Sequence, residues 1–332
     1  MKKALLLSNS PEQIDRVYGA GRLEKLKEQV ELYPHVISRE DLAEHQSELR
    51  EVQVVFSTWG MPDLHGDELS ALPSLEAVFY AAGSVQSFAR PFLDRGITVV
   101  SAWAANAVPV AEFALAQILL SCKGYFRNTL DCRNSARRHG GDAFKGAGIF
   151  GETVGLIGIG MIGRTLCRLL EPFNVQLIGH DPYLDDKTAA DLGLEMVDLA
   201  TLFSRSYVVT NHLPNIPTTR AMLNASHFGS MREGATFINT GRGAQVVEED
   251  LLDVLERRSD LTALLDVTFP EPPQHGSRFY SLPNVQLSSH IAGSLNDELV
   301  RMADYVLEDF ARWQRGEKLR YSVSLEMLDT MA

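Results

Sequence analysis

The chain is poor in cysteine and lacks the cysteine spacings that define metal or disulfide sites. Its 332 residues include three cysteines, Cys122, Cys132 and Cys167, and no two of them form a CxxC pair. This pattern excludes a disulfide framework and a cysteine zinc centre, and it suits a reducing compartment. We therefore expect no metal.

Positive charge is also scarce. The chain carries 31 basic and 43 acidic residues, a formal net charge of −12. A net-negative surface repels nucleic acid and anionic membranes, so neither is expected as a partner. This acidity does not exclude a locally basic pocket for a small anionic substrate.

Long uninterrupted apolar runs are missing as well. The N-terminal run Ala4–Leu7 is too short for a signal peptide. The segment Ile97–Cys122 carries one charge, Glu112, but Asn106 and Pro109 also lie near its middle, where burial in a bilayer is costly. We interpret this segment as a strand followed by a buried helix, and we predict a soluble, cytoplasmic protein.

Short apolar segments alternate with helical patterns along the chain. The expected strands are Ala4–Leu7, Val52–Ser57, Ala77–Ala82, Ile97–Ser101, Val154–Gly158, Val175–Gly179, Tyr207–Asn211, Ala235–Asn239, Ala263–Val267 and Val285–Ser288. Strands that alternate with helices predict the α/β class with parallel sheets.

Three helices have readable ends. Serine can cap a helix and proline suits its first turn, so Ser10-Pro11 predicts a helix start. A second helix is expected from Pro109 to Lys123. A third is expected from Leu295 to Arg315, with Ser294 as its cap and Gly316 at its end.

A glycine motif indicates a dinucleotide site. Gly158, Gly160 and Gly163 form GxGxxG between an apolar strand and a helical pattern, where they allow a tight turn, close approach of a pyrophosphate and close helix packing. Asp181 ends the next strand, where a carboxylate binds ribose hydroxyls and repels a 2′-phosphate, which favours NAD over NADP. A second GxGxxG, Gly146–Gly151, precedes a strand and is discarded. The alternative is a glycine-rich turn without a ligand.

Three later strands end in residues that suit hydride transfer to a 2-keto acid. Arg242 can hold a carboxylate and polarise a carbonyl, His290 can donate a proton, and Glu271 can fix the histidine tautomer. Taken singly, Arg242 and Glu271 can equally be surface residues. His275 lies closer to Glu271 in sequence, but it sits in a Pro/Gln/Gly loop, whereas His290 follows a strand.

In this order, these segments resemble the D-isomer-specific 2-hydroxyacid dehydrogenases of the formate/glycerate dehydrogenase type, including glyoxylate/hydroxypyruvate reductases. The resemblance extends from about Val52 to Gly316. It implies an NAD-dependent oxidoreductase that interconverts a small 2-keto acid and a D-2-hydroxy acid, with Arg242, Glu271 and His290 as catalytic residues and His290 as the acid/base.

The resemblance also implies the binding residues. The implied cofactor contacts are Gly158, Gly160, Met161, Ile162, Gly163, Asp181, His212, Leu213, Pro214, Thr219, Thr240, Gly241, Arg242, Asp266 and His290. The backbone N–H groups of Ala82, Gly83 and Ser84, together with Arg242, are implied to hold the substrate. Two positions depart from the family pattern, since Tyr207 stands where the family often has aspartate and Ser289 where it often has proline.

The implied architecture is two Rossmann-like or flavodoxin-like parallel-sheet domains. The substrate (catalytic) domain is predicted at 1–106 and 294–332, and the NAD-binding Rossmann domain at 107–293. A homodimer is implied, with Phe113 to Gly148 as the contact region. The tail Leu325–Ala332 is expected to be frayed, the alternative being an amphipathic turn.

Two other functions stay open at this point. One is an NAD-sensing regulatory or corepressor-like binding protein on the same fold, because a fold does not determine a function. The other is a phosphite-type dehydrogenase. A formate dehydrogenase is disfavoured, because formate enzymes of this type typically have glutamine where Glu271 stands.

Overall fold

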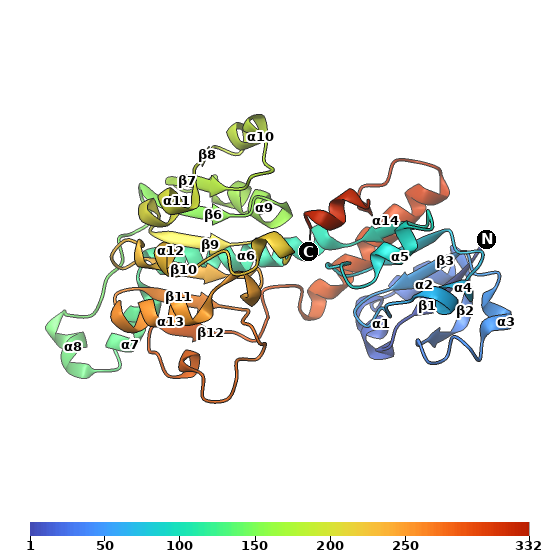
Figure 1. Cartoon of the computed structure of the whole chain (residues 1–332), viewed down its shortest axis with the longest axis horizontal. Coiled ribbons are helices and arrows are strands. Elements are labelled where there is room, and N and C mark those ends of the chain that lie inside the picture. Colours follow the sequence, from blue (N-terminus) through green and yellow to red (C-terminus); the bar gives the residue numbers. More distant parts are fainter. Residues whose placement is uncertain (332) are drawn as a thin grey trace. The chain divides into compact units, whose positions relative to one another are not determined.

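The structure, a computed structural model, describes residues 1–331 and consists of two compact units (Figure 1). One unit comprises Met1–Ala107 and the chain from Ser294 onward, and the other comprises Val108–Gly293. Each unit has its own predominantly parallel sheet with its own hydrophobic core. The predicted α/β class with two Rossmann-like or flavodoxin-like sheets is confirmed.

The first unit contains a six-stranded sheet in the order β13-β5-β4-β3-β1-β2. Its parallel strands follow the 2-1-3-4-5 order of flavodoxin-like sheets, and β13 is antiparallel to β5. The strands are β1 (Lys2–Leu7), β2 (Val30–Ile37), β3 (Val54–Ser57), β4 (Ala77–Tyr80), β5 (Thr98–Ser101) and β13 (Ser322–Val323). The helices are α1 (Pro11–Val17), α2 (Arg22–Lys27), α3 (Gln46–Leu49), α4 (Gly66–Ser70), α5 (Ala89–Leu93) and α14 (Leu299–Gln314).

Helix α14 supplies much of the core of this unit. Met302, Val306 and Phe310 are fully buried, and the Phe310 ring packs edge-on against Phe56 and Phe79, with ring centroids 5.0 and 5.2 Å apart. Met302, Val306 and Phe310 recur every four positions and so lie on one face of the helix, which packs on the sheet.

The start of α14 differs from the prediction. A 3-10 turn, η4 (Asn296–Glu298), precedes the helix, so Ser294 does not cap it. The N–H of Ser294 instead donates to Oδ1 of Asn106, 2.9 Å away. Gly316 ends the helix as predicted, with a positive φ of 67°.

The second unit contains a seven-stranded sheet in the order β12-β11-β10-β9-β6-β7-β8, all parallel. Counted within the unit, this is the 3-2-1-4-5-6 order of dinucleotide-binding folds with one further strand. The strands are β6 (Glu152–Ile157), β7 (Val175–His180), β8 (Leu194–Met196), β9 (Val208–Asn211), β10 (Thr236–Asn239), β11 (Thr262–Leu265) and β12 (Val285–Leu287). The helices are α9 (Met161–Leu170), α10 (Asp186–Asp191), α11 (Leu199–Arg205), α12 (Ala225–Gly229) and α13 (Glu248–Arg257).

Helix α6 (Trp103–Cys122) starts earlier than predicted and contains Pro109 in its interior. It is long and apolar enough to cross a membrane by length and composition. However, Ala111, Ala114, Ile118 and Cys122 are fully buried in a core that they share with strands of the second unit. Its apolar character is therefore that of a core helix, as the sequence predicted.

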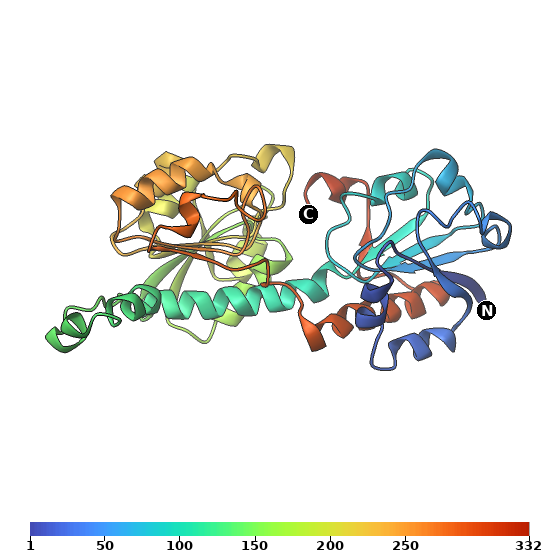
Figure 2. The same cartoon turned by 90° about the horizontal axis from the view of Figure 1, so that it is seen from below.

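Two short helices, α7 (Tyr125–Asp131) and α8 (Ser135–Gly140), follow α6. Figures 1 and 2 both show them beyond the end of α6, to one side of the seven-stranded sheet. None of the α8 side chains is buried. The chain after α6 thus forms a short helical arm.

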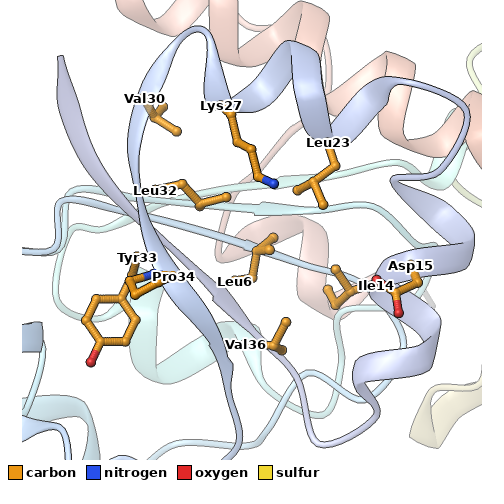
Figure 3. A pocket seen from close by; sticks show the side chains of 10 residues that line it. All are labelled: Leu6, Ile14, Asp15, Leu23, Lys27, Val30, Leu32, Tyr33, Pro34 and Val36. Atoms are coloured by element: carbon orange, nitrogen blue, oxygen red, sulfur yellow. The ribbon is translucent and has the colours of Figure 1, made fainter.

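An irregularity in β2 opens a hollow in the first unit. Ala4 pairs with Leu32 and Leu6 with Val36, so β2 has two more residues than β1 between these pairs. A hollow of about 550 Å³ lies beside this bulge, with mainly aliphatic walls from β1, α1, α2 and β2 (Figure 3). It contains none of the residues singled out from the sequence.

The remaining differences concern short or irregular elements. Strands β2, β8 and β13 were not predicted. Helix α1 starts at Pro11 as expected, but Ser10 makes no side-chain cap bond. The predicted fraying of the tail is wrong for Glu326–Asp329, which form the 3-10 turn η5 with Leu328 buried, while Ala332 lies outside the described residues.

Candidate active site

The glycine motif forms the turn between β6 and α9. Gly158 has a φ of +84°, and a Cβ atom there would lie 2.9 Å from the carbonyl of His212. A Cβ atom at Gly163 would lie 2.5 Å from the oxygen of Gly158, so the helix packs closely on the turn. Nothing lies within 4 Å of a Cβ at Gly160, which leaves open space in front of the N-terminus of α9.

Asp181 follows β7 and already has two backbone partners. Its Oδ2 accepts from the N–H of Ile159 at 2.7 Å, and its Oδ1 accepts from the N–H of Tyr183 at 2.9 Å. The carboxylate is thereby fixed beside the glycine turn. Each carboxylate oxygen can accept a further hydrogen bond, which a ribose hydroxyl can supply.

His212 follows β9 and ties two strand ends together. Its Nε2 lies 3.0 Å from the hydroxyl of Thr210, and its Nδ1 lies 3.0 Å from the hydroxyl of Thr240. Burial lowers the pKa of His212 to about 3, so the ring is neutral at neutral pH. Both ring nitrogens already have hydrogen-bond partners. Any polar contact between a cofactor and the segment His212–Pro214 must therefore come from an atom other than the His212 ring nitrogens.

A buried amide network, which the sequence did not reveal, holds the next turn. Nδ2 of Asn211 donates to Oδ1 of Asn239 (2.9 Å) and to Oε1 of Gln245 (2.6 Å). Nε2 of Gln245 donates to the carbonyl oxygens of Leu213 and Pro214 at 2.6 and 2.9 Å. The network joins the turns after β9 and β10 into one rigid piece.

Two other residues predicted beside the cofactor take part in local backbone contacts. The hydroxyl of Thr219 donates to the carbonyl of Pro214 at 2.6 Å. The N–H of Gly241 donates to Oδ1 of Asn239 at 3.1 Å. These bonds fix the backbone on both sides of the amide network.

Arg242 follows β10 and is partly buried. Its N–H donates to Oε1 of Gln245 at 3.0 Å, and its Nη1 donates to the carbonyl of Gly241 at 2.7 Å. Burial lowers the pKa of Arg242 from its ordinary value, while the negative charge of Glu271 opposes this change. The guanidinium stays charged and retains free N–H donors for a carboxylate or carbonyl oxygen.

His290 and Glu271 form a pair at the ends of β12 and β11. Nδ1 of His290 lies 2.7 Å from Oε1 of Glu271. An ionised carboxylate only accepts hydrogen bonds, so Nδ1 carries the proton and Nε2 is left to exchange one with a substrate. The side chains are 45% and 39% exposed. His275, the sequence neighbour of Glu271, is not its partner.

Asp266 holds the backbone of the His290 loop. Its Oδ1 accepts from the Ser288 hydroxyl (2.6 Å) and the Ile291 N–H (2.9 Å), and its Oδ2 accepts from the Ala292 N–H (2.9 Å). The N–H of His290 donates to the carbonyl of Asp266 itself, and His290 has a φ of +57°. These bonds fix the loop where Ser289 replaces the proline common in the family.

The predicted substrate loop lies after β4 in the first unit. The Ser101 hydroxyl lies 2.9 Å from the carbonyl oxygen of Ala82 and 2.6 Å from that of Gly83. The N–H groups of Ala82, Gly83 and Ser84 have no hydrogen-bond partner within residues 1–331. A loop with its carbonyls held and successive N–H groups free suits an anion.

Within residues 1–331, no three His, Cys, Asp or Glu side chains gather in a way that could hold a metal ion. The site of the second unit does fit a dinucleotide. The open space at Gly160 leaves room for a pyrophosphate, and the free N–H groups at the start of α9 can bind it.

This fold and this set of residues define a two-unit α/β protein with a dinucleotide-binding unit. Residues 115–292 match the family model of the D-isomer specific 2-hydroxyacid dehydrogenase, NAD binding domain. The chain therefore belongs to the D-isomer-specific 2-hydroxyacid dehydrogenase family, and its cofactor is NAD(H).

Curated relatives carry names from this family. The chain is 33% identical over 236 residues to the putative 2-hydroxyacid dehydrogenase YoaD of Bacillus subtilis (68% of this chain, 65% of the relative). It is 32% identical over 217 residues to the hydroxypyruvate reductase of Thermotoga maritima (65% and 69%). It is 27% identical over 236 residues to the D-3-phosphoglycerate dehydrogenase of Archaeoglobus fulgidus (71% and 44%). The chain thus spans less than half the length of the Archaeoglobus fulgidus relative.

Solved structures share the fold over nearly the whole chain. A phosphoglycerate oxidoreductase from Rhizobium etli superposes with a TM-score of 0.80 at 24% identity, covering 99% of this chain and 100% of that one. The D-mandelate dehydrogenase of Rhodotorula graminis gives 0.80 at 21% identity, covering 97% of both chains. At these identities the likeness establishes the fold.

Proposed function

We propose that the chain interconverts a small 2-keto acid and the corresponding D-2-hydroxy acid, with His290 as the acid/base. The observation that carries this proposal is the pairing of His290 Nδ1 with Glu271 Oε1 at 2.7 Å, with Glu271 also acting through its charge on the partly buried Arg242. Carbonyl reduction needs a proton donor and a cation close to one oxygen, and these residues provide both.

The roles of the residues follow from their contacts. The glycine turn and the start of α9 would hold NAD(H), which when bound would provide the hydride for reduction of the carbonyl carbon or accept it in the reverse direction. His290 donates a proton from Nε2 to the carbonyl oxygen, or accepts one from the hydroxyl in the reverse direction. Glu271 holds the ring through Nδ1 and offsets the positive charge that His290 carries when protonated. Arg242 donates to the substrate oxygens, and the Ala82–Ser84 N–H groups bind the carboxylate.

The experiment offers the protein a panel of 2-keto acids together with NADH and measures the reaction by the decrease in NADH absorbance. The panel contains glyoxylate, hydroxypyruvate, pyruvate, 2-ketobutyrate and phenylpyruvate. We expect oxidation of NADH with at least one of them. If the protein binds NADH tightly but turns over no member of the panel, the proposal is wrong and an NAD-binding regulator is the better assignment.

We also infer that the chain forms a homodimer through Phe113 to Gly148. The support is the α7–α8 arm, which carries no buried α8 side chain, and the exposed side chains of Leu120 and Tyr125. Light scattering after size-exclusion chromatography measures the mass. A deletion of 134–142 is expected to yield the monomer mass, and an unchanged dimer mass would rule out this arm.

A further inference from the structure

The loop that carries Glu271 has few means of being held in place. In the segment Phe269–Pro273, three of the five residues are prolines, which have no N–H group. The only backbone donors in this segment are therefore the N–H groups of Phe269 and Glu271. The Phe269 side chain is 68% exposed and gives the loop little packing.

One of these two donors is bound by a carboxylate from a different element. Glu248, the first residue of α13, accepts the N–H of Phe269 through Oε1 at 2.6 Å. The two residues are 21 positions apart in the sequence. This bond connects helix α13 to the backbone two residues before Glu271.

Two side chains from outside the segment bind its backbone: Glu248 at the Phe269 N–H, and Tyr280, whose hydroxyl donates to the carbonyl of Pro273 at 3.1 Å. Of these two bonds, the Glu248 bond holds the part of the segment that precedes Glu271. The Thr268 hydroxyl donates to the carbonyl of Pro270 at 2.9 Å, which is a bond within the loop itself. A Cβ atom at Gly243 would collide with the carbonyl of Thr268, so the Arg242 turn presses on the loop from one side. Only Glu248 binds the Phe269 amide from outside the loop.

We propose that Glu248 is a positioning residue that holds the Phe269–Pro273 loop so that Glu271 meets the His290 ring. This role rests on the proposed function. The positioning role requires an acceptor oxygen at the end of a side chain as long as that of glutamate. It does not require a negative charge, because the donor is an uncharged amide. Burial raises the pKa of Glu248 to about 7, with the Phe269 amide opposing and the charge of Glu249 adding to the rise. A protonated carboxyl group still offers its carbonyl oxygen to Phe269.

Substitutions at Glu248 distinguish the effect of side-chain length from the effect of the negative charge. Glu248→Gln keeps the acceptor at the same reach, Glu248→Asp keeps the charge but shortens the side chain, and Glu248→Ala removes both. The matched control is Glu249→Gln. Glu249 is the next residue of α13, is 80% exposed, and pairs with Arg278 instead of the loop.

The first readout is the steady-state kinetics with the keto acid of the panel that supports NADH oxidation by the parent protein. We expect kcat to fall about tenfold or more for Glu248→Ala, with a similar trend for Glu248→Asp, because small misplacements of catalytic groups cost large factors. Glu248→Gln is expected to stay within about threefold of the parent, since the acceptor is retained. KM for NADH should be unchanged in all Glu248 variants. The Glu249→Gln control should keep the kcat of the parent.

Nitrogen-15 NMR of histidine-labelled protein without substrate gives a readout that does not depend on turnover. The Nδ1 proton of His290 is identified by its loss in His290→Gln, and it should weaken or shift in Glu248→Ala and stay in Glu248→Gln. If the parent oxidises no NADH but this signal behaves as expected, the proposed function fails and the positioning role stands. Parent-like kcat and NMR signal in Glu248→Ala overturn the positioning role. If Glu248→Ala does not fold, parent-like behaviour of Glu248→Asp overturns it equally.

Discussion

The Nδ1 atom of His290 lies 2.7 Å from the Oε1 atom of Glu271, although the two residues are 19 positions apart and follow different strands. The pairing leaves Nε2 as the one ring nitrogen that can exchange a proton with a bound oxygen.

Replacing His290 by alanine should abolish the proton transfer and leave the dinucleotide site intact. We expect turnover to fall by roughly 10²-fold or more, the scale of a lost general acid. The affinity for NADH, measured by fluorescence titration, should not change. His275→Ala is the control, because His275 is nearer to Glu271 in sequence yet does not pair with it. Near-normal turnover in His290→Ala would refute the assignment.

Asp181 is expected to set the preference for NADH over NADPH. Asp181→Asn removes the negative charge that repels a 2′-phosphate and keeps one oxygen for the backbone amides of the turn. The ratio of kcat/KM for NADH to that for NADPH should fall by about tenfold or more, which corresponds to roughly 1.4 kcal/mol. Asp185→Asn, which alters the cap of α10, should leave the ratio alone. An unchanged ratio in Asp181→Asn would assign the preference to other residues.

Ser101 should affect substrate affinity through the loop after β4. The serine hydroxyl holds the carbonyls of Ala82 and Gly83, and its loss frees a loop whose N–H groups are proposed to bind the carboxylate. We expect Ser101→Ala to raise KM for the keto acid by about fivefold, in line with a lost hydrogen bond of about 1 kcal/mol. KM for NADH should not move. A parallel rise in both constants would point to general destabilisation instead.

The ionisation of Glu248 should appear in the pH dependence of stability. Its pKa is about 7 in the folded chain against an ordinary value of 4.5, so the folded chain binds the proton better than the unfolded chain does. The contribution of Glu248 to stability is therefore full below about pH 4.5 and is lost as the pH rises towards about 7.

Glu248→Gln lacks this titration and should gain stability relative to the parent between about pH 5 and about pH 8. We expect a gain on the order of 1 kcal/mol, reduced from the full linkage value because solvent reaches this half-buried carboxyl group. Urea unfolding at about pH 5 and about pH 8 measures this gain, with Glu256→Gln on the same helix as the reference, because Glu256 is 61% exposed and pairs with Arg278. A stability difference that does not change with pH would show that Glu248 titrates normally.

The parts of the structure that were predictable from sequence are those with strong local signals. The strands that lead to Gly158, Asp181 and Arg242 are apolar runs that end in turn residues, and all of them form. Strand β2 was missed because Pro34 and His35 interrupt its apolar pattern at the edge of the sheet. Strand β13 has two residues and exists only through its pairing with β5.

The connections inside the site were the unpredictable part. Asn211 and Gln245 bond side chain to side chain across 34 positions, and either residue alone reads as an ordinary polar turn residue. The sequence also did not reveal that the two carboxylate oxygens of Asp266 accept three hydrogen bonds from the His290 loop. Such contacts depend on which strand ends become neighbours, and that information is in the sheet order and not in any local segment.

The residues proposed for proton transfer, Arg242, Glu271 and His290, all belong to Val108–Gly293, whereas the proposed carboxylate loop belongs to the unit that begins at Met1. On this proposal, the acid–base pair and the carboxylate loop are encoded in separate stretches of the gene, and Arg242 is the proposed substrate contact that lies in the same unit as the pair. Changes around Ala82–Ser84 can accumulate without touching the hydrogen bonds that align the acid–base pair. If the proposed roles hold, directed evolution of specificity in this protein should begin with the first unit, because substitutions there leave Glu271 and His290 unchanged.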